Sequence, residues 1–438
     1  MQVIDSNKAD APVSAHRGRL DGWTIVRFAH AYESGGGLEQ YLADLNQALG
    51  QRNRMTLIQM QMTTDRSRLA ESTEELGESQ LVKIPMWVPA ESKNASINAK
   101  EPGLLEKCKT SFRKRILFAP VIYRSLTREK LKRWQVPRRS GEPEGAGAKL
   151  RELLARYRVK LVVLHSTGGA DASEILDVAK QAGVPSVIVH HFANDRLASM
   201  ALGRQILQAT AIGGVCGVDV PPFLSGQFSN LADGIDIDFF SRKKAKPVTP
   251  APSAPVLFLP ARITATKGQL DLVRAGGELL RQGLQFQIVF AGRVDSDEFL
   301  ARLQKEIVAA GLRERVSFVG QLNAEGLRDW YAAASVLAFP THHHEGLPRI
   351  LLEAQAMGLP PVVHDIGGTS EGIDHGKTGY LVPVGDRSAV AQYLGKLLRN
   401  AELRRQFGEA GRQLVEQKFS LPSLAERHET FYLKAVNS

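Results

Sequence analysis

Short apolar runs alternate with longer amphipathic stretches through most of the chain. Runs of this kind are typical of buried strands, and the stretches between them have helical periodicity. In the first half the apolar runs are Trp23–Ala29, Met55–Met60, Leu81–Ile84, Leu161–Leu164 and Ser186–Val189. In the second half they are Val256–Leu259, Phe286–Phe290, Val316–Val319, Val336–Phe339, Pro361–Val363 and Gly379–Val382. Strands that alternate with helices predict βαβ units and parallel sheets, and therefore an α/β fold.

A proline-rich segment separates the two series. Residues 246–255 contain four prolines and no periodic pattern, as expected of a linker. With 438 residues, the chain is also too long for a single core. We therefore expect an N-terminal domain over 1–245, a C-terminal domain over 256–420 and a last helix within 421–438. Two such doubly wound domains form a cleft between their facing strand ends.

The composition argues against a membrane-spanning or disulfide-stabilised protein. No apolar run approaches the roughly 20 residues that span a bilayer, and the polar N-terminus (1–22) lacks the apolar core of a signal peptide. The two cysteines, Cys108 and Cys216, cannot form a disulfide framework and lack the spacing of metal ligands. We expect a cytoplasmic location.

Glu345 and Glu353 lie eight residues apart across the start of a predicted helix. The apolar run before them predicts a strand, and the helix should begin near Pro348 and end near Gly358. Glu345 then lies at the carboxyl end of a strand, where open α/β sheets bind ligands. Carboxylates can accept hydrogen bonds from sugar hydroxyls, and the helix N-terminus can bind a phosphate, so a sugar nucleotide fits. Two solvated glutamates beside an ordinary amphipathic helix are the alternative.

Two cations, Arg262 and Lys267, follow the first strand of the second series. Such a pair in a strand-to-helix loop can clamp a diphosphate and stabilise its charge as a leaving group. Gly35, Gly36 and Gly37 follow the first strand of the chain, and their backbone can approach a phosphate closely. Loops of basic proteins often hold such cation pairs, and a glycine turn can serve packing alone, so both alternatives stay open.

His165 and His191 each end a strand of the first series and face the predicted cleft. A histidine in this position can hydrogen-bond a sugar hydroxyl or a reacting group. A structural role is the alternative. His190 leaves open which ring faces the cleft, because neighbours in a strand point to opposite faces.

Three segments share some features of a metal site. The run His342–His344 precedes Glu345, but consecutive residues cannot all converge on one ion. Asp236–Asp238 and Asp295–Asp297 match the D-x-D pattern of metal-dependent sugar transferases, a tripeptide that is frequent by chance. We expect no metal and no other cofactor.

Together these features resemble the retaining glycosyltransferases of family 4, which have the GT-B fold of two Rossmann-like domains. The resemblance is strongest from Val256 to about Phe419, where the two cations match the family's basic pair and the two glutamates match its E-x7-E motif. The segments 353–363, 366–372 and 376–382 continue it at the right spacings. The first half matches more loosely, through the glycine loop, the histidines and Leu231–Asp236.

The resemblance implies a role for each matching residue. Arg262 and Lys267 bind the donor diphosphate and stabilise it as it leaves. Glu353 holds the ribose hydroxyls, whereas Glu345 and His191 contact the donor sugar. The expected donor-binding residues are Gly36, Gly37, Arg262, Lys267, Glu345, Gly346, Leu347, Glu353, Gly367 and Gly368, and the expected catalytic residues are Arg262, Lys267, Glu345 and His191.

The resemblance also implies a mechanism and one feature of the fold. The reaction retains anomeric configuration, and the leaving phosphate oxygen helps to deprotonate the acceptor hydroxyl on the same face. No metal is required, because Arg and Lys neutralise the diphosphate. The last helix returns to the first domain. The chain departs from the family where Asp233-Gly234 replaces the usual Asn-Gly, a change that preserves the turn but leaves the linker geometry less certain.

Most of the chain's net charge of +10 lies in one basic segment, residues 101–140, which holds twelve Lys and Arg and three Glu. Apolar side chains are interleaved with the cations, a pattern that suits an anionic membrane surface. The expected acceptor or membrane residues are Arg113, Lys114, Arg115, Lys130, Lys132, Arg133 and Trp134. A solvated helix face packed on its own domain is the alternative. We expect no nucleic-acid partner, because no recognisable binding module accompanies the charge.

These expectations combine into one functional hypothesis. The chain is expected to transfer a hexose from a nucleoside-diphosphate sugar to a glycan or lipid-linked saccharide, in bacterial polysaccharide, lipopolysaccharide or glycolipid assembly. Its expected location is the cytoplasm, at the cytoplasmic face of the inner membrane if the basic segment binds lipid. A catalytically degenerate protein that binds a nucleotide sugar without turnover is the alternative. The sequence leaves open the base and sugar of the donor and the identity of the acceptor.

Overall fold

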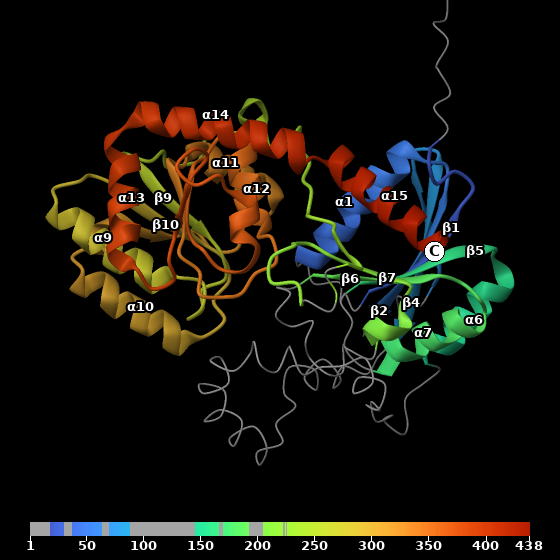
Figure 1. The fold of residues 1–438 in the computed structure, drawn as a ribbon. Helices are drawn as coiled ribbons and strands as arrows, with labels where there is room; N and C mark the ends of the chain where they lie inside the picture. The colour runs from blue at the N-terminus through green and yellow to red at the C-terminus, as the bar shows by residue number, and fades with distance from the viewer. Residues whose placement is uncertain are drawn as a thin grey trace, which may run out of the picture.

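The computed structural model describes residues 18–29, 37–63, 70–87, 145–165, 170–191, 205–221, 224 and 226–438. These residues form two α/β units, each built on its own sheet (Figure 1). We call them the first and the second domain.

The first domain holds an eight-stranded sheet in the order β3-β4-β2-β1-β5-β6-β7-β8, in which only β3 and β4 pair antiparallel. Its strands are β1 (Thr24–Ala29), β2 (Thr56–Thr63), β3 (Ser72–Leu76), β4 (Ser79–Trp87), β5 (Val159–His165), β6 (Ser186–His190), β7 (Ala211–Gly214) and β8 (Phe228–Asn230). Its helices are α1 (Gly37–Arg52), α6 (Ala146–Arg156) and α7 (Ala170–Gln181). Ile25 packs in the core that contains α1, whereas Val26 packs in the core that contains α6 and α7. This alternation is that of a strand buried on both faces.

The second domain holds a six-stranded parallel sheet in the order β11-β10-β9-β12-β13-β14. Its strands are β9 (Val256–Pro260), β10 (Gln287–Ala291), β11 (Val316–Phe318), β12 (Val336–Phe339), β13 (Pro361–His364) and β14 (Tyr380–Val382). Its helices are α9 (Gln269–Arg281), α10 (Asp297–Ala309), α11 (Ala324–Ala333), α12 (Arg349–Ala356), α13 (Arg387–Arg399) and α14 (Ala401–Lys418). The described residues also form three short 3₁₀ helices: η4 (Arg242–Lys244), η5 (Arg313–Arg315) and η6 (Gly367–Gly372).

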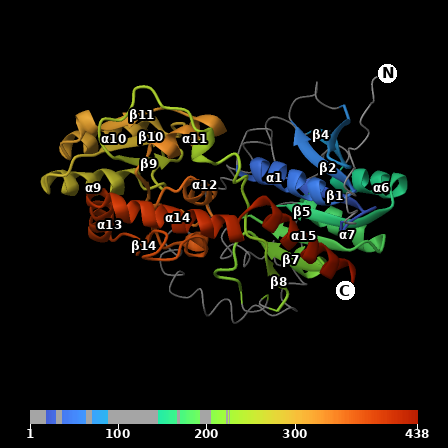
Figure 2. The ribbon, with the colours of Figure 1, turned by 90° about the horizontal axis from the view of Figure 1, so that it is seen from above.

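The C-terminus crosses back from the second domain to the first. Helix α14 runs along the second domain, and α15 (Leu421–Val436) continues onto the first domain beside α1 (Figures 1 and 2). Phe431 of α15 shares a core with Tyr41 and Leu45 of α1, because α15 presents an apolar face to the first domain. The predicted fold, two doubly wound domains with a returning C-terminal helix, is confirmed.

Three strands depart from the sequence analysis, β3, β7 and β8; the last two are only four and three residues long. Strand β3 was not predicted, because its sequence Ser-Thr-Glu-Glu-Leu has no apolar alternation and four of its five side chains are exposed. It is an edge strand, held to β4 by backbone hydrogen bonds, and Lys83 pairs with Glu74 across the two strands. Within the described residues, no helix has the length and apolar character to cross a membrane.

Candidate functional site

A cavity of about 360 Å³ lies between the two domains and gathers most of the described residues that the sequence analysis singled out. Its lining comes from Leu38, Tyr41, His191, Val215, Asp233, Pro260, Ala261, Arg262, Lys267, Phe339, Glu345, Gly346, Leu347, Pro348, Arg349 and Ile350. The loops that follow β9 and β12 meet here because the two strands are neighbours in the sheet. This is the topological switch point, where doubly wound sheets bind ligands.

Lys267 and Glu345 form an ion pair in the lining of this cavity. Their side chains are 12% and 21% exposed, so both are partly shielded yet within reach of a ligand. Gly268, with φ of 86°, turns the chain into α9 directly after Lys267, and a Cβ there would collide with the carbonyl of Pro340. The glycine therefore allows the β9 and β12 loops to approach closely.

Arg262 is paired with Asp295, which also accepts a hydrogen bond of 3.1 Å from Arg293. Asp295 belongs to the D-x-D segment considered above, and the other members of that segment serve helix α10. Ser296 caps the helix by accepting from Phe299 N at 3.2 Å, and the next residue lies in the first turn. In this structure the segment supplies a helix cap and a partner for arginine.

Two glycines bring the backbone of η6 against the loop that carries Glu345. Gly367 has φ of 56°, and a Cβ there would collide with the carbonyl oxygen of Glu345. Gly368 N donates to the same oxygen at 3.1 Å, and a Cβ on Gly368 would collide with the carbonyl of Gly346. These glycines thus pack on the loop of Glu345 and Gly346, and their expected contact with phosphate or sugar stays a prediction.

Glu353 lies behind the cavity wall. It is 7% exposed, and its Oε2 accepts a hydrogen bond of 3.0 Å from Tyr331. Burial raises the pKa of Glu353, and Arg349, whose Nε lies 3.8 Å from Oε1, opposes this increase. Its expected role as a ribose ligand stays a prediction. Reaching a ribose requires the carboxylate to rotate out of this buried position.

The first-domain wall is built from His191 and the groups behind it. His191 lines the cavity, whereas His190, the last residue of β6, is buried. His191 is therefore the ring that faces the cleft. His191 Nε2 lies 2.9 Å from Nδ1 of the buried His165. Although part of His191 faces the cavity, desolvation lowers its pKa to about 3, with a smaller effect from His190. His191 is therefore neutral at pH 7 and acts as a hydrogen-bonding group.

Arg349 is the functional candidate that the sequence analysis missed. Its Nη2 donates to Asp44 of α1 at 2.6 Å, and its Nη1 donates to both carboxylate oxygens of Asp233 at 2.9 Å. A signal was present in the sequence, since Arg349 interrupts the apolar run from Leu347 to Leu352. The partners were not predictable, because Asp44 is 305 residues away.

A second interdomain contact lies at η6. Glu371 accepts hydrogen bonds from the backbone N of Gly217 and from Asn230 Nδ2, the latter at 2.8 Å. Unlike the Arg349 contact, it is solvent-exposed. The glycines of η6 are therefore connected to the first domain through a neighbouring carboxylate.

The histidine run before Glu345 has structural partners. His342 pairs with Asp271, which also accepts from Arg387 Nε at 2.8 Å. These two partners outweigh burial and lower the pKa of Asp271. Within the described residues, no group of three or more His, Cys, Asp or Glu side chains has the geometry to hold a metal ion.

A sequence model of the glycosyl transferases group 1 family matches residues 241–414. This range contains the two cations, both glutamates and the glycines of η6. Residues 241–414 are thus similar in sequence to this family.

Named relatives align with parts of the chain. The alpha-D-kanosaminyltransferase of Streptomyces kanamyceticus is 31% identical over 40% of this chain and 44% of its own length. The N-acetyl-alpha-D-glucosaminyl L-malate synthase of Bacillus anthracis is 34% identical over 37% and 41% of the two chains. A GDP-mannose-dependent mannosyltransferase of Corynebacterium glutamicum is 29% identical over 57% and 70%. The chain thus spans about half the length of the first two relatives.

Solved structures extend the likeness to the whole fold. A glycosyltransferase from Rickettsia africae superposes with a TM-score of 0.65 at 16% identity, covering 95% of this chain and 99% of its own. Anabaena Alr3699/HepE, solved with UDP, has a TM-score of 0.66 at 15% identity and coverage of 94% and 100%. At these identities the likeness shows the fold, which is GT-B.

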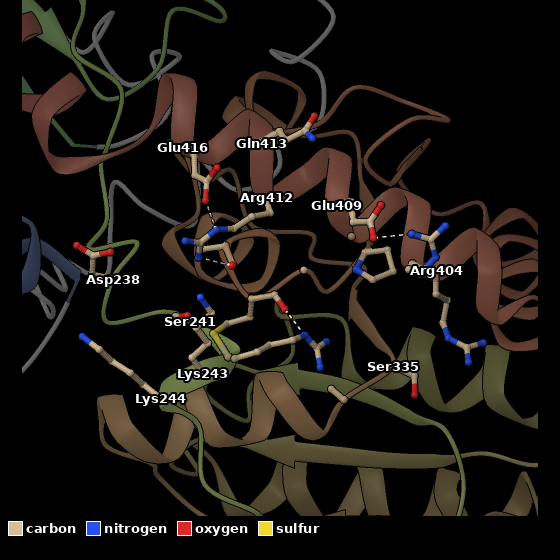
Figure 3. A pocket seen from close by; sticks show the side chains of 18 residues that line it. Asp238, Ser241, Lys243, Lys244, Ser335, Arg404, Glu409, Arg412, Gln413 and Glu416 are labelled. Carbon is tan, nitrogen blue, oxygen red and sulfur yellow. Dashed lines mark hydrogen bonds and ion pairs between the residues drawn. The ribbon is translucent and has the colours of Figure 1, made fainter.

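Figure 3 shows a larger cavity, of about 1070 Å³, outside the interdomain cleft. It lies in the second domain, where η4 meets the end of α12 and the side of α14. Several of its lining residues are basic. Arg412 donates to the carbonyls of Phe240 and Ala356 at 2.7 Å each, and Arg242 donates to that of Met357 at 2.7 Å. These two cations tie the interdomain connection to the second domain.

Some predicted site residues lie outside the described residues. They are Gly36 of the glycine loop and the basic-segment residues Arg113, Lys114, Arg115, Lys130, Lys132, Arg133 and Trp134. Gly37 is the first residue of α1. The roles expected of these residues stay predictions.

Proposed function

We propose that the chain transfers a hexose from a nucleoside-diphosphate sugar to a glycan or lipid-linked saccharide. The proposal is carried by one observation, the convergence of Arg262, Lys267 and Glu345 with His191 of the other domain on one cavity. The group 1 family match and the relatives' names, which include several sugar transferases, support it.

On the donor side, the diphosphate replaces the carboxylates that pair with Lys267 and Arg262 in this structure. Lys267 is paired with Glu345 and Arg262 with Asp295, so both cations already hold an anionic oxygen. A diphosphate presents more negative charge to the same donors and gains charge as the sugar leaves. Release of Glu345 from Lys267 then frees its carboxylate to accept hydrogen bonds from the hexose hydroxyls.

The proposed chemistry retains anomeric configuration. The leaving phosphate oxygen deprotonates the acceptor hydroxyl on the face it leaves, while Arg262 and Lys267 stabilise the diphosphate without a metal. Neutral His191 contributes a hydrogen bond from the opposite wall of the cavity, because its lowered pKa keeps it uncharged. Analysis of product configuration by NMR tests retention: an inverted anomer contradicts it. Loss of activity in excess EDTA contradicts metal independence.

Donor binding and turnover test the main proposal. A thermal-shift screen with UDP-, GDP- and ADP-sugars identifies the donor, since a ligand at 100 times its Kd stabilises by about 2.7 kcal/mol. Labelled donor and saccharide acceptors then report transfer. We expect Lys267→Ala to abolish it, and Lys305→Ala, a change at an exposed lysine of α10, to preserve it. Binding without turnover by the unmodified protein would instead identify a degenerate nucleotide-sugar-binding protein.

We further propose that the acceptor is part of a polysaccharide, lipopolysaccharide or glycolipid assembled at the cytoplasmic face of the membrane. The basic segment (101–140) supplies the attraction to anionic lipid, with each cation near the surface contributing about 1 kcal/mol. Flotation with anionic vesicles tests this. Binding that is lost when Arg113, Lys114 and Arg115 are neutralised supports the proposal, and no binding by the unmodified chain refutes it.

A further inference from the structure

Arg349 joins three segments of the chain at the domain boundary. It lies in the first turn of α12 in the second domain and reaches Asp44 on α1 and Asp233 at the end of the first domain. The three side chains, which we call the Arg349 tie, are 13%, 8% and 6% exposed. Buried charges in proteins are paired, and this pairing is possible only while the two domains are in contact.

The geometry of the tie requires arginine. One guanidinium nitrogen spans both oxygens of Asp233 and the other reaches Asp44, so a single planar group serves two carboxylates. A lysine ammonium is a point charge and cannot reproduce this fork. Asp44 is further oriented by Gln40 Nε2, at 3.0 Å from its second oxygen. Each member is thus fixed by more than one contact.

The tie lies close in sequence to residues of the cavity wall. Arg349 is the first residue of α12 and follows Glu345, in the preceding loop, by four residues, and on α1, Asp44 follows Tyr41 by three. Tyr41 lies edge-on to His191, with ring centroids 4.5 Å apart, and both line the cavity. A change in the distance between α1 and α12 therefore changes the distance from His191 to Glu345.

A buried ion pair favours one geometry but adds little net stability to the fold. Desolvation of the charges offsets much of the attraction, but removal of one partner leaves an uncompensated buried charge. The tie therefore favours one domain arrangement over all arrangements in which its members separate. Asp233 stands where the resembled family usually has Asn, and its second carboxylate oxygen is one of the two that Arg349 binds.

We propose that Arg349 is a positioning residue. Through Asp44 and Asp233, it holds the cleft at the width at which His191 and Glu345 contact the same sugar. This inference rests on the proposed function for the identity of the ligand. The existence of the tie does not, because the tie forms without a substrate.

The test separates cleft width, nucleotide binding and turnover. Small-angle X-ray scattering of the full chain without substrate compares the unmodified protein with Arg349→Met. We expect a larger radius of gyration in the variant. Affinity for the nucleoside diphosphate of the identified donor should change by less than about threefold, because Arg262 and Lys267 both lie in the second domain. Turnover should fall on the order of 10²-fold, the usual consequence of a misplacement of about 1 Å.

Matched variants distinguish the tie from general damage. Arg405→Met removes an arginine that also bridges two carboxylates, Glu402 and Glu409, but within the exposed face of α14. It should leave scattering and turnover unchanged. Asp44→Asn should lower turnover in the unmodified background. In Arg349→Met it should have less than about a twofold effect on turnover, because both changes break the same contact.

Three results would overturn the proposal. They are an unchanged radius of gyration in Arg349→Met, a loss of diphosphate affinity that matches the loss of turnover, or multiplicative effects of Asp44→Asn and Arg349→Met. If Arg349→Met does not fold, Arg349→Lys and Asp44→Asn decide by the same scattering and turnover criteria. If the unmodified chain turns over no donor, the proposed function fails, and scattering alone still decides whether the tie exists.

Discussion

At the scale of single residues, the proposed donor site contains two cations whose carboxylate partners belong to the protein. Lys267 pairs with Glu345, and Arg262 pairs with Asp295. Glu345 has a double role, since it neutralises Lys267 before binding and is expected to hold the sugar afterwards. Its charge therefore opposes binding of the diphosphate alone but assists binding of the complete donor.

Replacement of Glu345 should separate these two roles. In Glu345→Gln, Lys267 loses its anionic partner, so we expect affinity for the free nucleoside diphosphate to rise severalfold, by about 1 kcal/mol. Turnover should fall because the hexose loses a charged hydrogen-bond acceptor. Isothermal titration and the transfer assay measure the two effects. Glu314→Gln, on the exposed surface of η5, is the control, and equal losses of affinity and turnover would contradict the argument.

At the scale of elements, α15 is the part of the chain that completes the first domain. Its apolar face shares a core with α1, and Glu429 accepts hydrogen bonds from Arg52 and Asn53, each at 3.0 Å. The helix thus covers an apolar face formed by described residues of the first domain.

Truncation of one buried ring in α15 should measure this packing. Phe431 is 2% exposed, so Phe431→Ala should lower the free energy of unfolding by about 3–5 kcal/mol. Lys434→Ala, an exposed position on the same helix, should change it by less than about 0.5 kcal/mol. Urea denaturation followed by circular dichroism gives both values. Similar small losses for both variants would show that α15 is not part of the folded core.

The packing of α15 on α1 should also depend on pH. His428 Nδ1 lies 3.0 Å from the carbonyl of Leu424 and therefore donates, which leaves Nε2 to accept from Tyr41 Oη at 2.8 Å. Burial, opposed by the Leu424 hydrogen bond and aided by Arg27 and Arg427, lowers the pKa of His428 to about 3. The unfolded chain binds a proton below about pH 6.5 and the folded chain does not, so stability falls as pH drops from 6.5 toward 3.

A variant without this titration isolates the effect. Between pH 7 and pH 5, the unmodified protein should lose about 2 kcal/mol more stability than His428→Gln. Burial raises the pKa values of Asp44, Asp233 and Glu353, so these groups stabilise the fold as pH falls, opposite to His428. Their contribution is the same in both proteins and cancels in the comparison. Denaturation curves at the two pH values provide the measurement. Parallel pH dependence of the two proteins would contradict a neutral buried His428.

At the scale of the whole molecule, several kinds of contact join the domains within the described residues. The Arg349 tie and the exposed Glu371 contact bridge the cleft, and α15 crosses behind it. Arg242 and Arg412, the latter labelled in Figure 3, hold the interdomain connection against the second domain. These contacts act on different segments, so their effects should be separable by mutation.

Arg412 offers the clearest test of the connection. In Arg412→Met the carbonyls of Phe240 and Ala356 lose a charged donor, which should lower the stability of the second domain by about 1.5–3 kcal/mol. Cleavage near residues 246–255 should also become faster in limited proteolysis. Arg405→Met, on the same helix, is the control. Unchanged cleavage in Arg412→Met would show that the connection is held by other contacts.

Much of the fold could be predicted from local patterns. The apolar runs gave eleven of the strands because a strand buried on both faces is uniformly apolar over a few residues, as β9 and β12 are. Strand β3 was missed because only its backbone pairing defines it, and β7 and β8 were missed because they are only four and three residues long. Within the candidate site, Arg262, Lys267 and Glu345 were predictable, since they stand in a recognisable order, whereas Arg349 was not predicted.

The sequence by itself determined the two α/β series, the connection between them and the ordered donor-site residues, because these features depend on neighbours within a few positions. Only the tertiary structure decided which charges meet. Lys267 and Glu345 pair because β9 and β12 are adjacent in the sheet. Arg349 pairs with Asp44 because α1 and α12 meet at the domain boundary. Such pairings depend on the packing of whole elements, which no local pattern records.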